Sequence, residues 1–468
     1  MGRTVEDGIA GNGSRSRAPV LDGAPYRPER AAAGAGGLIA RSRELAHIDE
    51  LLWRARRGAG GVVALHGEPG VGKTVLVDAA VSRAAEFRTV QVRGSVGTGA
   101  VADPGAWPAP LGELASRLDD FVVQPPPLAA DRAPAETGTP EPPSPAAVEA
   151  LASGLRRMTE AAGSPLLVTV DDCQELPATF VDALAGAVLT HLRDDPVGLI
   201  LAWRDSPHLA PFHLARPDVP LHRLGGLTLG QAVQLMRSRF EQLPAETVLN
   251  ELVVRSAGNP LVLADVYGRL TPEQLAGWHP LPDPLPVSDV VVDAFDVVRR
   301  FPDTTRRALT VAAAAHVPRD VMLAAMRQLG VDRGDLAPAV EAGVVYERGP
   351  RIDFAHPLVR AAAFRGAPLD LRRSVRRALS DELARGQAIE TSAYHAAIDA
   401  PTPDQLAARR LGEAAQVAID RGDLEAAARH EEFASRFAAE DAAAAQYLAS
   451  AASHWLACGR RDRARYCA

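Results

Sequence analysis

Residues 67–74 read GEPGVGKT and lie between the apolar run at 62–65 and a helix-like segment at 75–80. This order is typical of a phosphate-binding loop that joins a strand to a helix. Glycine lets the backbone curl until successive amide groups point at a polyphosphate, and the start of the next helix adds a partial positive charge. We therefore expect three glycines of this loop to cradle phosphate groups: Gly67, Gly70 and Gly72.

Two side chains close the loop, Lys73 and Thr74. The spacing predicts that Lys73 reaches the β- and γ-phosphates of ATP and that the Thr74 hydroxyl ligates Mg²⁺. Lys73 is the only lysine of the chain, and every other position that carries Lys or Arg is arginine. Because a planar guanidinium cannot replace a compact ammonium in a tight loop, the single lysine favours an ATP or ADP site over a chance match in a glycine-rich turn.

Length and composition limit the class of protein. The 468 residues predict about three domains. Hydrophobic residues make up 47%, yet no apolar run approaches the roughly 20 residues of a membrane span. Residues 1–30 lack the apolar segment of a secretory signal and the three cysteines have no metal-site spacing, so we expect a cytoplasmic protein without a membrane partner. The net charge of -7 differs from the basic excess usual in DNA-binding domains.

Apolar runs alternate with helical patterns in the first half of the chain. Candidate strands lie at 62–66, 89–93, 166–170 and 198–203, and helical spacing appears at 45–52 and 111–118. Apolar runs separated by helices predict a parallel sheet covered on both faces. Residues 124–145 hold eight prolines, too many for a regular element, so they are expected to form a surface loop within this domain.

The strand signal stops at Thr228, and helical patterns follow at 229–240, 245–256, 259–270, 304–315 and 320–329. A short helix, a β-pair at 344–346 and 352–354 and another helix, all between residues 336 and 360, indicate a winged-helix unit. In the last segment, residues 411–423 can be laid on 448–460 at a spacing of 37. Such hairpins resemble tetratricopeptide repeats, with an alanine-rich bundle as the alternative.

We therefore predict an α/β P-loop NTPase with an AAA-like parallel sheet, followed by an all-α lid, a winged helix and TPR-like helical hairpins. The N-terminus is expected to be disordered because it lacks hydrophobic periodicity. The expected segments are 1–36 (disordered), 37–226 (ATPase domain), 227–285 (lid), 286–385 (winged-helix domain) and 386–468 (start of the repeat array).

Three polar residues follow candidate strands, whose carboxyl ends line the ligand crevice in a sheet of this type. Asp171 and Asp172 follow the strand at 166–170, and Arg204 follows the strand at 198–203. Asp171 is the expected Mg²⁺ partner, through water, and Asp172 is placed to orient or deprotonate an attacking water. The Arg204 guanidinium could sense the γ-phosphate. The alternatives are a helix-capping pair for the aspartates and a surface ion pair for Arg204.

Two further motifs carry less information by themselves. Pro260, in GNPL at 258–261, stands at a first helical turn and is ordinary capping. His356, in HPLVR at 356–360, is by itself a hydrogen-bonded histidine at the start of a helix. The other histidines have no Cys or carboxylate set at ligand spacing, so the sequence predicts no metal site beyond nucleotide-bound Mg²⁺.

The order of these motifs resembles that of signal-transducing AAA-type (STAND) ATPases, and more narrowly the N-terminal two thirds of large ATP-binding LuxR-family transcriptional regulators of actinobacteria. The resemblance covers about residues 37–468 and implies a regulatory switch. In that family an ADP-bound closed form opens on inducer and ATP binding and then forms a homo-oligomer. The motifs that carry it are LIAR at 38–41, the phosphate loop, VDD at 170–172, GNPL at 258–261 and FAHPLVR at 354–360.

The resemblance also implies site roles and partners. Arg41 would lie near the adenine, Pro260 would be a lid contact to the nucleotide, and His356 would lock the ADP-bound form. Arg204 would be the sensor of the γ-phosphate, and Asp172 would act on water. The helical repeats would receive a small-molecule or protein inducer.

Three departures from the family pattern bear on these roles. Ala40 stands where the family usually has Gly, beside the expected adenine contact. Glu175 and Pro177 stand where it has Trp and Asp, which supports nucleotide binding more firmly than hydrolysis. The chain ends at Ala468 among repeats, so promoter DNA would be bound only through a C-terminal helix-turn-helix that this sequence lacks.

Two other functions stay open. An ATPase of the origin-recognition type would use the winged helix on DNA, and a basic face there would favour it. The only hint is the arginine-rich segment at 372–377, which also fits a solvated helix face. A nucleotide-binding scaffold that never hydrolyses ATP would instead assemble partners through the repeats. ATP turnover, expected to be slow and regulatory, separates the switch from the scaffold.

Overall fold

The computed structural model describes residues 41–94, 143, 145–176, 178–205, 219–314, 317–348 and 351–468. Several sequence-based predictions lie outside these residues. They are the disorder at 1–36, the LIA part of the first motif, the helix at 111–118 and nearly all of the proline-rich loop. Among the residues described, no helix is both long and apolar enough to cross a membrane.

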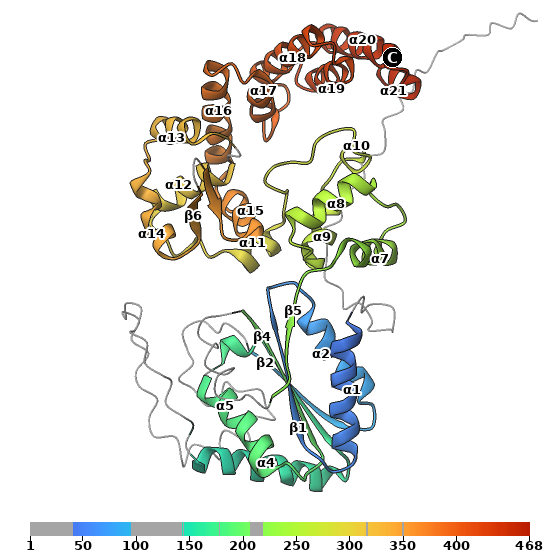
Figure 1. Ribbon diagram of the computed structural model, residues 1–468, viewed down its shortest axis with the longest axis vertical. Coiled ribbons are helices and arrows are strands. Elements are labelled where there is room, and N and C mark those ends of the chain that lie inside the picture. Colours follow the sequence, from blue (N-terminus) through green and yellow to red (C-terminus); the bar gives the residue numbers. More distant parts are fainter. Residues whose placement is uncertain are drawn as a thin grey trace, which may run out of the picture. The chain divides into compact units, whose positions relative to one another are not determined.

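The first part of the described chain contains a five-stranded parallel sheet in the order β2-β3-β4-β1-β5 (Figure 1). The four predicted strands are confirmed with small shifts at their ends. The fifth was not predicted, because Leu221–Leu224 is short and has two polar residues between its leucines. The strands are β1 Gly61–Gly67, β2 Arg88–Arg93, β3 Leu166–Asp171, β4 Val197–Arg204 and β5 Leu221–Leu224.

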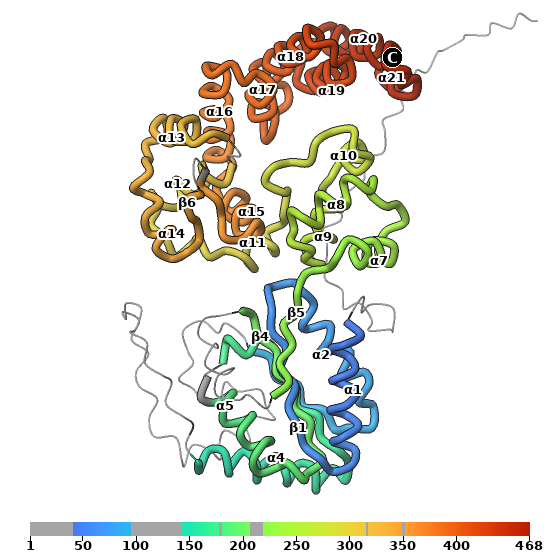
Figure 2. Tube along the Cα trace, viewed as in Figure 1, coloured from blue at the N-terminus to red at the C-terminus, as the bar shows by residue number. Residues whose placement is uncertain are grey.

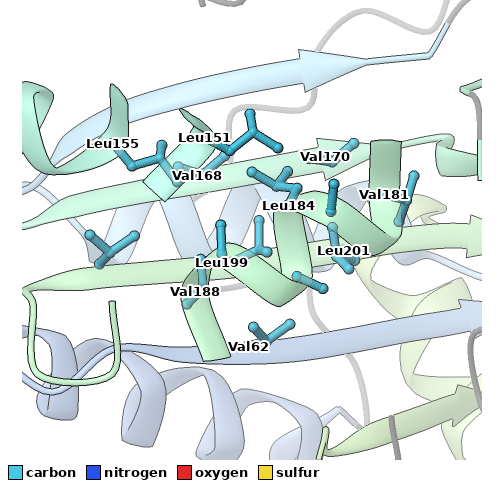
Figure 3. Close-up of a cluster of buried hydrophobic side chains, with 14 of the residues drawn as sticks. Val62, Leu151, Leu155, Val168, Val170, Val181, Leu184, Val188, Leu199 and Leu201 are labelled. Carbon is cyan, nitrogen blue, oxygen red and sulfur yellow. The ribbon is translucent and has the colours of Figure 1, made fainter. Parts of the chain in front are cut away.

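Helices cover both faces of this sheet, as predicted. Alternate residues of β1 point to opposite faces, so Val63 and Leu65 join one core and Val62 and Ala64 the other. The first core includes Ile48 and neighbours from α1 Ser42–Arg56 and α2 Lys73–Arg83. The second lies under α4 Pro145–Ala162 and α5 Ala178–Gly186 (Figure 3).

Figure 3 shows aliphatic side chains gathered on the second face of the sheet. Valines and leucines of β1, β3 and β4 meet leucines from the two covering helices. Burial on both faces explains why β3 and β4 are nearly continuous apolar runs and why their charged residues stand at the carboxyl ends. The core side chains labelled there are Val62, Leu151, Leu155, Val168, Val170, Val181, Leu184, Val188, Leu199 and Leu201.

A group of short helices follows the sheet and has its own apolar core. Four of the five, all but α8, start at a capping residue that the sequence displays. Thr228 and Gln231 form a capping box, and Asn259 caps the helix that Pro260 begins. The helices are α7 Leu229–Arg239, α8 Glu246–Arg255, α9 Pro260–Tyr267, α10 Pro272–Leu275 and α11 Asp289–Phe295.

The next segment contains the predicted β-pair, with helices before and after it. Strands β6 Val345–Arg348 and β7 Arg351–Phe354 are antiparallel. Most of the helices here share one core with Val345 and Phe354, while the inner face of α15 contributes to the core of the preceding helices. The helices are α12 Asp303–Ala314, α13 Arg319–Gln328, α14 Ala337–Glu341, α15 Pro357–Arg365 and α16 Leu369–Arg385.

The C-terminal helices pack one against the next in chain order, and the tube in Figure 2 follows this succession. Buried alanines lie where the helices meet, as expected from the small residues in the repeat. Gly422 and Gly459, 37 residues apart, both lie in turns between helices. The helices are α17 Ile389–Ala397, α18 Gln405–Asp420, α19 Leu424–Ser435, α20 Asp441–Ala457 and α21 Arg461–Cys467. The TPR-like class and the domain boundaries stay predictions.

Candidate functional site

The phosphate-loop sequence joins the end of β1 to the start of α2. Gly67, Gly70 and Gly72 all have positive φ, at 153°, 75° and 106°, a region that side chains other than glycine rarely enter. Gly70 also lies against the first turn of α9, where a Cβ atom would be 2.7 Å from the Cβ of Leu261. The curled backbone therefore requires glycine for its own conformation and for the approach of a later helix.

Lys73 is buried at the bottom of this loop. Its Nζ donates to the carbonyl oxygens of Gly67 and Glu68, at 2.8 Å each. Burial lowers the pKa of Lys73 to about 8, with a further lowering from the charge of Arg204, while the nearby aspartates act in the opposite direction. An anion bound in the loop would therefore stabilise the charged ammonium, which suits a polyphosphate.

Thr74 and Asp171 meet at the carboxyl ends of the strands. The Thr74 Oγ1 donates a hydrogen bond to Asp171 Oδ2 at 2.7 Å, and the Asp171 side chain is buried. The other oxygen, Oδ1, accepts the backbone N–H of Asp172 at 2.9 Å. A hydroxyl and a carboxylate side by side are the hard oxygen donors that Mg²⁺ takes together with water and phosphate. These two residues therefore fit the predicted metal role.

Asp172 and Arg204 are also brought together. Arg204 Nε lies 3.4 Å from Asp172 Oδ1, and the same oxygen accepts a hydrogen bond from Gln174 Nε2 at 2.9 Å. Asp172 has a φ of 53°, so its backbone is in the left-handed region. Gln174 was not singled out in the sequence. The only available signal was an amide side chain two residues after the acidic pair.

The GNPL motif contacts the phosphate loop through Asn259. Its Nδ2 donates to the carbonyl oxygen of Pro69 at 2.8 Å, while its Oδ1 accepts the N–H groups of Leu261 and Val262 and caps α9. Pro260 is the first residue of that helix. The motif therefore does more than cap a helix, and the sequence did not reveal which of its residues reaches the loop.

His356 caps α15 and contacts the same loop. Its Nδ1 accepts the N–H of Leu358 at 3.2 Å, as the isolated motif predicts. Its Nε2 lies 3.0 Å from Glu68 Oε1, and its ring stacks on Phe295 with the ring centres 5.9 Å apart. A residue from the region after the β-pair is thus held against the second residue of the phosphate loop.

Arg41, the residue before α1, also contacts the phosphate loop. Its guanidinium donates to the carbonyl oxygens of Val71 at 3.1 Å and Gly225 at 2.8 Å, and it pairs with Glu44. Burial lowers the pKa of Arg41, with Glu44 acting in the opposite direction. Arg41 ties the loop to the segment after β5, and its contact with adenine stays a prediction.

No group of three or more His, Cys, Asp or Glu side chains that could hold a metal ion occurs in the part of the chain that the structure describes. The sheet, the loop and the paired oxygens of Thr74 and Asp171 define the class of protein, an α/β P-loop NTPase. Consistent with this class, residues 37–201 match the family model of the AAA ATPase domain. No curated protein matches the chain.

Several solved structures are similar to this chain at low sequence identity. A signal transduction ATPase with numerous domains (STAND) and a tetratricopeptide repeat sensor, from Pyrococcus horikoshii, is 14% identical with a TM-score of 0.33, and the match covers 96% of this chain but 65% of that one. The Holliday junction branch migration motor RuvB from Thermotoga maritima is 14% identical with a TM-score of 0.32, and the match covers 68% of this chain and 92% of the RuvB chain. Orc1 from Aeropyrum pernix, solved in complex with DNA, is 15% identical with a TM-score of 0.37, and the match covers 75% of this chain and 94% of the Orc1 chain.

Proposed function

We propose that this chain is a signal-transduction switch that binds ATP or ADP with Mg²⁺, hydrolyses ATP slowly and uses the nucleotide state to control its helical regions. The observation that carries the proposal is the pair of contacts on neighbouring loop residues. Glu68 meets His356 of α15, and the carbonyl of Pro69 meets Asn259 of α9. A phosphate loop that only binds nucleotide has no need of contacts from two later segments of the chain.

The residues at the strand ends have separate roles in the hydrolysis. The loop amides and Lys73 hold the phosphates, and Thr74 and Asp171 would hold Mg²⁺, which neutralises charge that develops on the phosphate oxygens. Asp172 orients a water molecule for attack on the γ-phosphorus and accepts its proton, as the bond to the ADP oxygen breaks. Arg204 leaves its pairing with Asp172 to contact the γ-phosphate.

The finer role that we propose is regulation of transcription, as in the LuxR-type regulators that the motif order resembles. An inducer, either a small molecule or a protein, would bind the C-terminal helices α17–α21 and favour the ATP-bound form. That form would assemble into a homo-oligomer in the cytoplasm. Promoter DNA would be bound through a helix-turn-helix domain outside these 468 residues.

The arginine-rich segment of α16 does not support the DNA-binding alternative. Arg376 is buried and contacts the carbonyl of Ala314, and Arg373 donates to the carbonyl of Asp399. Arg372 lies with them near the carboxylate of Asp399. Three of the four arginines are therefore used inside the fold, so this segment offers no basic stripe to a DNA backbone.

The test is the nucleotide content and ATP turnover of the purified chain, compared with Lys73→Ala and Asp172→Asn. Bound ADP with slow turnover, lost in Lys73→Ala, is the expected result. Asp172→Asn should retain nucleotide and lose turnover. If the native chain binds nucleotide and never hydrolyses it, the result supports the alternative of a non-hydrolysing scaffold. If the native chain binds no nucleotide, the proposal is refuted.

A further inference from the structure

Gln174 links the two strand ends that carry the hydrolysis residues. It lies in the single turn Cys173–Glu175 that follows β3. Its Nε2 donates to Asp172 Oδ1 at 2.9 Å, and its Oε1 accepts the backbone N–H of Arg204, the last residue of β4, also at 2.9 Å. We propose that Gln174 is a positioning residue, which holds Asp172 in place for the attack of water. This role rests on the proposed ATP hydrolysis.

The orientation of the Gln174 amide follows from its partners. A backbone N–H can only donate, so the atom that faces Arg204 must be the amide oxygen. The NH₂ group must then face Asp172, whose carboxylate accepts it. A glutamate at this position has no donor for Asp172, and a leucine has neither donor nor acceptor. The bridge therefore requires an amide.

The bridge matters because the other partner of Asp172 has to leave. Arg204 Nε lies 3.4 Å from the same Oδ1, and a guanidinium that turns to a γ-phosphate can no longer hold that oxygen. Gln174 is bonded to the backbone of Arg204 and not to its side chain. Asp172 therefore keeps one fixed hydrogen bond whichever way the arginine side chain points.

Asp172 also needs this support for conformational reasons. Its φ of 53° costs on the order of 1 kcal/mol for a residue other than glycine. Gln174 and Arg204 Nε both contact Oδ1, and we assign Oδ2 to the attacking water. Without Gln174, the carboxylate can rotate about its own side-chain bonds, and a displacement of about 1 Å can cost on the order of 100-fold in rate.

The experiment compares wild type with Gln174→Glu and Gln174→Leu in ATP turnover, ATP affinity and urea unfolding. Gln416→Glu is the matched control, because Gln416 Nε2 makes the same kind of bond to Asp420 at 2.8 Å on the exposed side of α18. We expect kcat to fall 10- to 100-fold in both Gln174 variants, with ATP affinity within about threefold of wild type. Gln416→Glu should leave kcat unchanged.

The comparison of kcat with ATP affinity gives a readout that separates a positioning role from a purely structural one. A structural defect near the loop would lower ATP affinity and kcat together. Loss of the bridge should lower kcat in both Gln174 variants while ATP affinity is retained.

Three results would overturn the positioning role. They are an unchanged kcat in both variants, a loss of ATP affinity as large as the loss of kcat, and a fall in stability that accounts for the lost activity. A wild-type chain without turnover would refute the proposed hydrolysis, and the positioning role with it. Wild-type turnover combined with any of the three results refutes the positioning role alone.

Discussion

Replacing Asn259 by aspartate separates two functions that the asparagine combines. The Oδ1 atom caps α9, and a carboxylate oxygen can do the same. The Nδ2 atom donates to the carbonyl of Pro69, and a carboxylate cannot. Asn259→Asp therefore keeps the helix cap, removes the bond to the phosphate loop and places two oxygens against each other. Asn259→Ala removes both the cap and the bond.

The expected magnitudes follow from these contacts. Loss of the Pro69 bond leaves a carbonyl without its partner next to a buried side chain, which costs about 1–3 kcal/mol. Loss of the cap in Asn259→Ala adds about 1 kcal/mol. Since the lost bond fixes the backbone between Glu68 and Gly70, we expect nucleotide affinity to fall about 10- to 100-fold in Asn259→Asp, equivalent to about 1.4–2.8 kcal/mol.

Calorimetric titration with ADP and urea unfolding measure the two effects separately. Asp423→Ala is the control, because Asp423 caps α19 through the N–H of Ala426 and has no contact with the loop. It should lose about 1 kcal/mol of stability and no ADP affinity. The reasoning fails if Asn259→Asp binds ADP as tightly as wild type does, or if Asp423→Ala loses as much affinity.

Two further predictions concern buried charges. The pKa of Lys73 is lowered from 10.5 to about 8, so the unfolded chain binds more protons between these values. The free energy of unfolding without nucleotide should then rise with pH across this window, by roughly 3 kcal/mol at most, and urea unfolding of Lys73→Met should lack this rise. Glu432 is buried beside Arg463 and accepts the indole N–H of Trp455 at 3.3 Å. Glu432→Gln should cost about 3–5 kcal/mol in urea unfolding, whereas Glu425→Gln, at a partly exposed ion pair, should cost less than about 1 kcal/mol.

The sheet and the loop were predictable because their signals are local. Burial on both faces makes β1, β3 and β4 apolar along their length, and the loop glycines are required by backbone conformation. Strand β5 lacks such a signal, since only Leu224 of its four residues is buried. Its pairing with β1 depends on the sheet being already present.

The contacts around the loop were beyond sequence reasoning for a different reason. Asn259 and Pro69 are 190 residues apart in the chain, and no periodic pattern connects them. The sequence shows Gln174 as a polar residue near the end of a strand. Only the fold shows that its side chain reaches the backbone of Arg204. For His356, the sequence predicted the bond to its own helix, and only the fold brings Glu68 to the opposite side of the ring.

In the proposed switch, a change at the phosphates would reach the helical regions first through Lys73. Its ammonium holds the carbonyl of Glu68, the residue whose carboxylate meets His356. A phosphate that draws the ammonium away releases this carbonyl. The next carbonyl, of Pro69, accepts a hydrogen bond from Asn259. The contacts of His356 and Asn259 therefore both depend on the backbone at Glu68 and Pro69.

The position of Asn259 is in turn fixed by backbone contact. The N–H of Leu227 donates to the carbonyl of Gly258 at 2.7 Å, and a Cβ on Gly226 would lie 1.9 Å from the carbonyl oxygen of Ala257. The two segments can approach so closely only with glycine at these positions. A ligand shifts a conformational equilibrium only through contacts that differ between its states. The nucleotide can therefore act on α9 and α15 to the extent that it changes the backbone at Glu68 and Pro69.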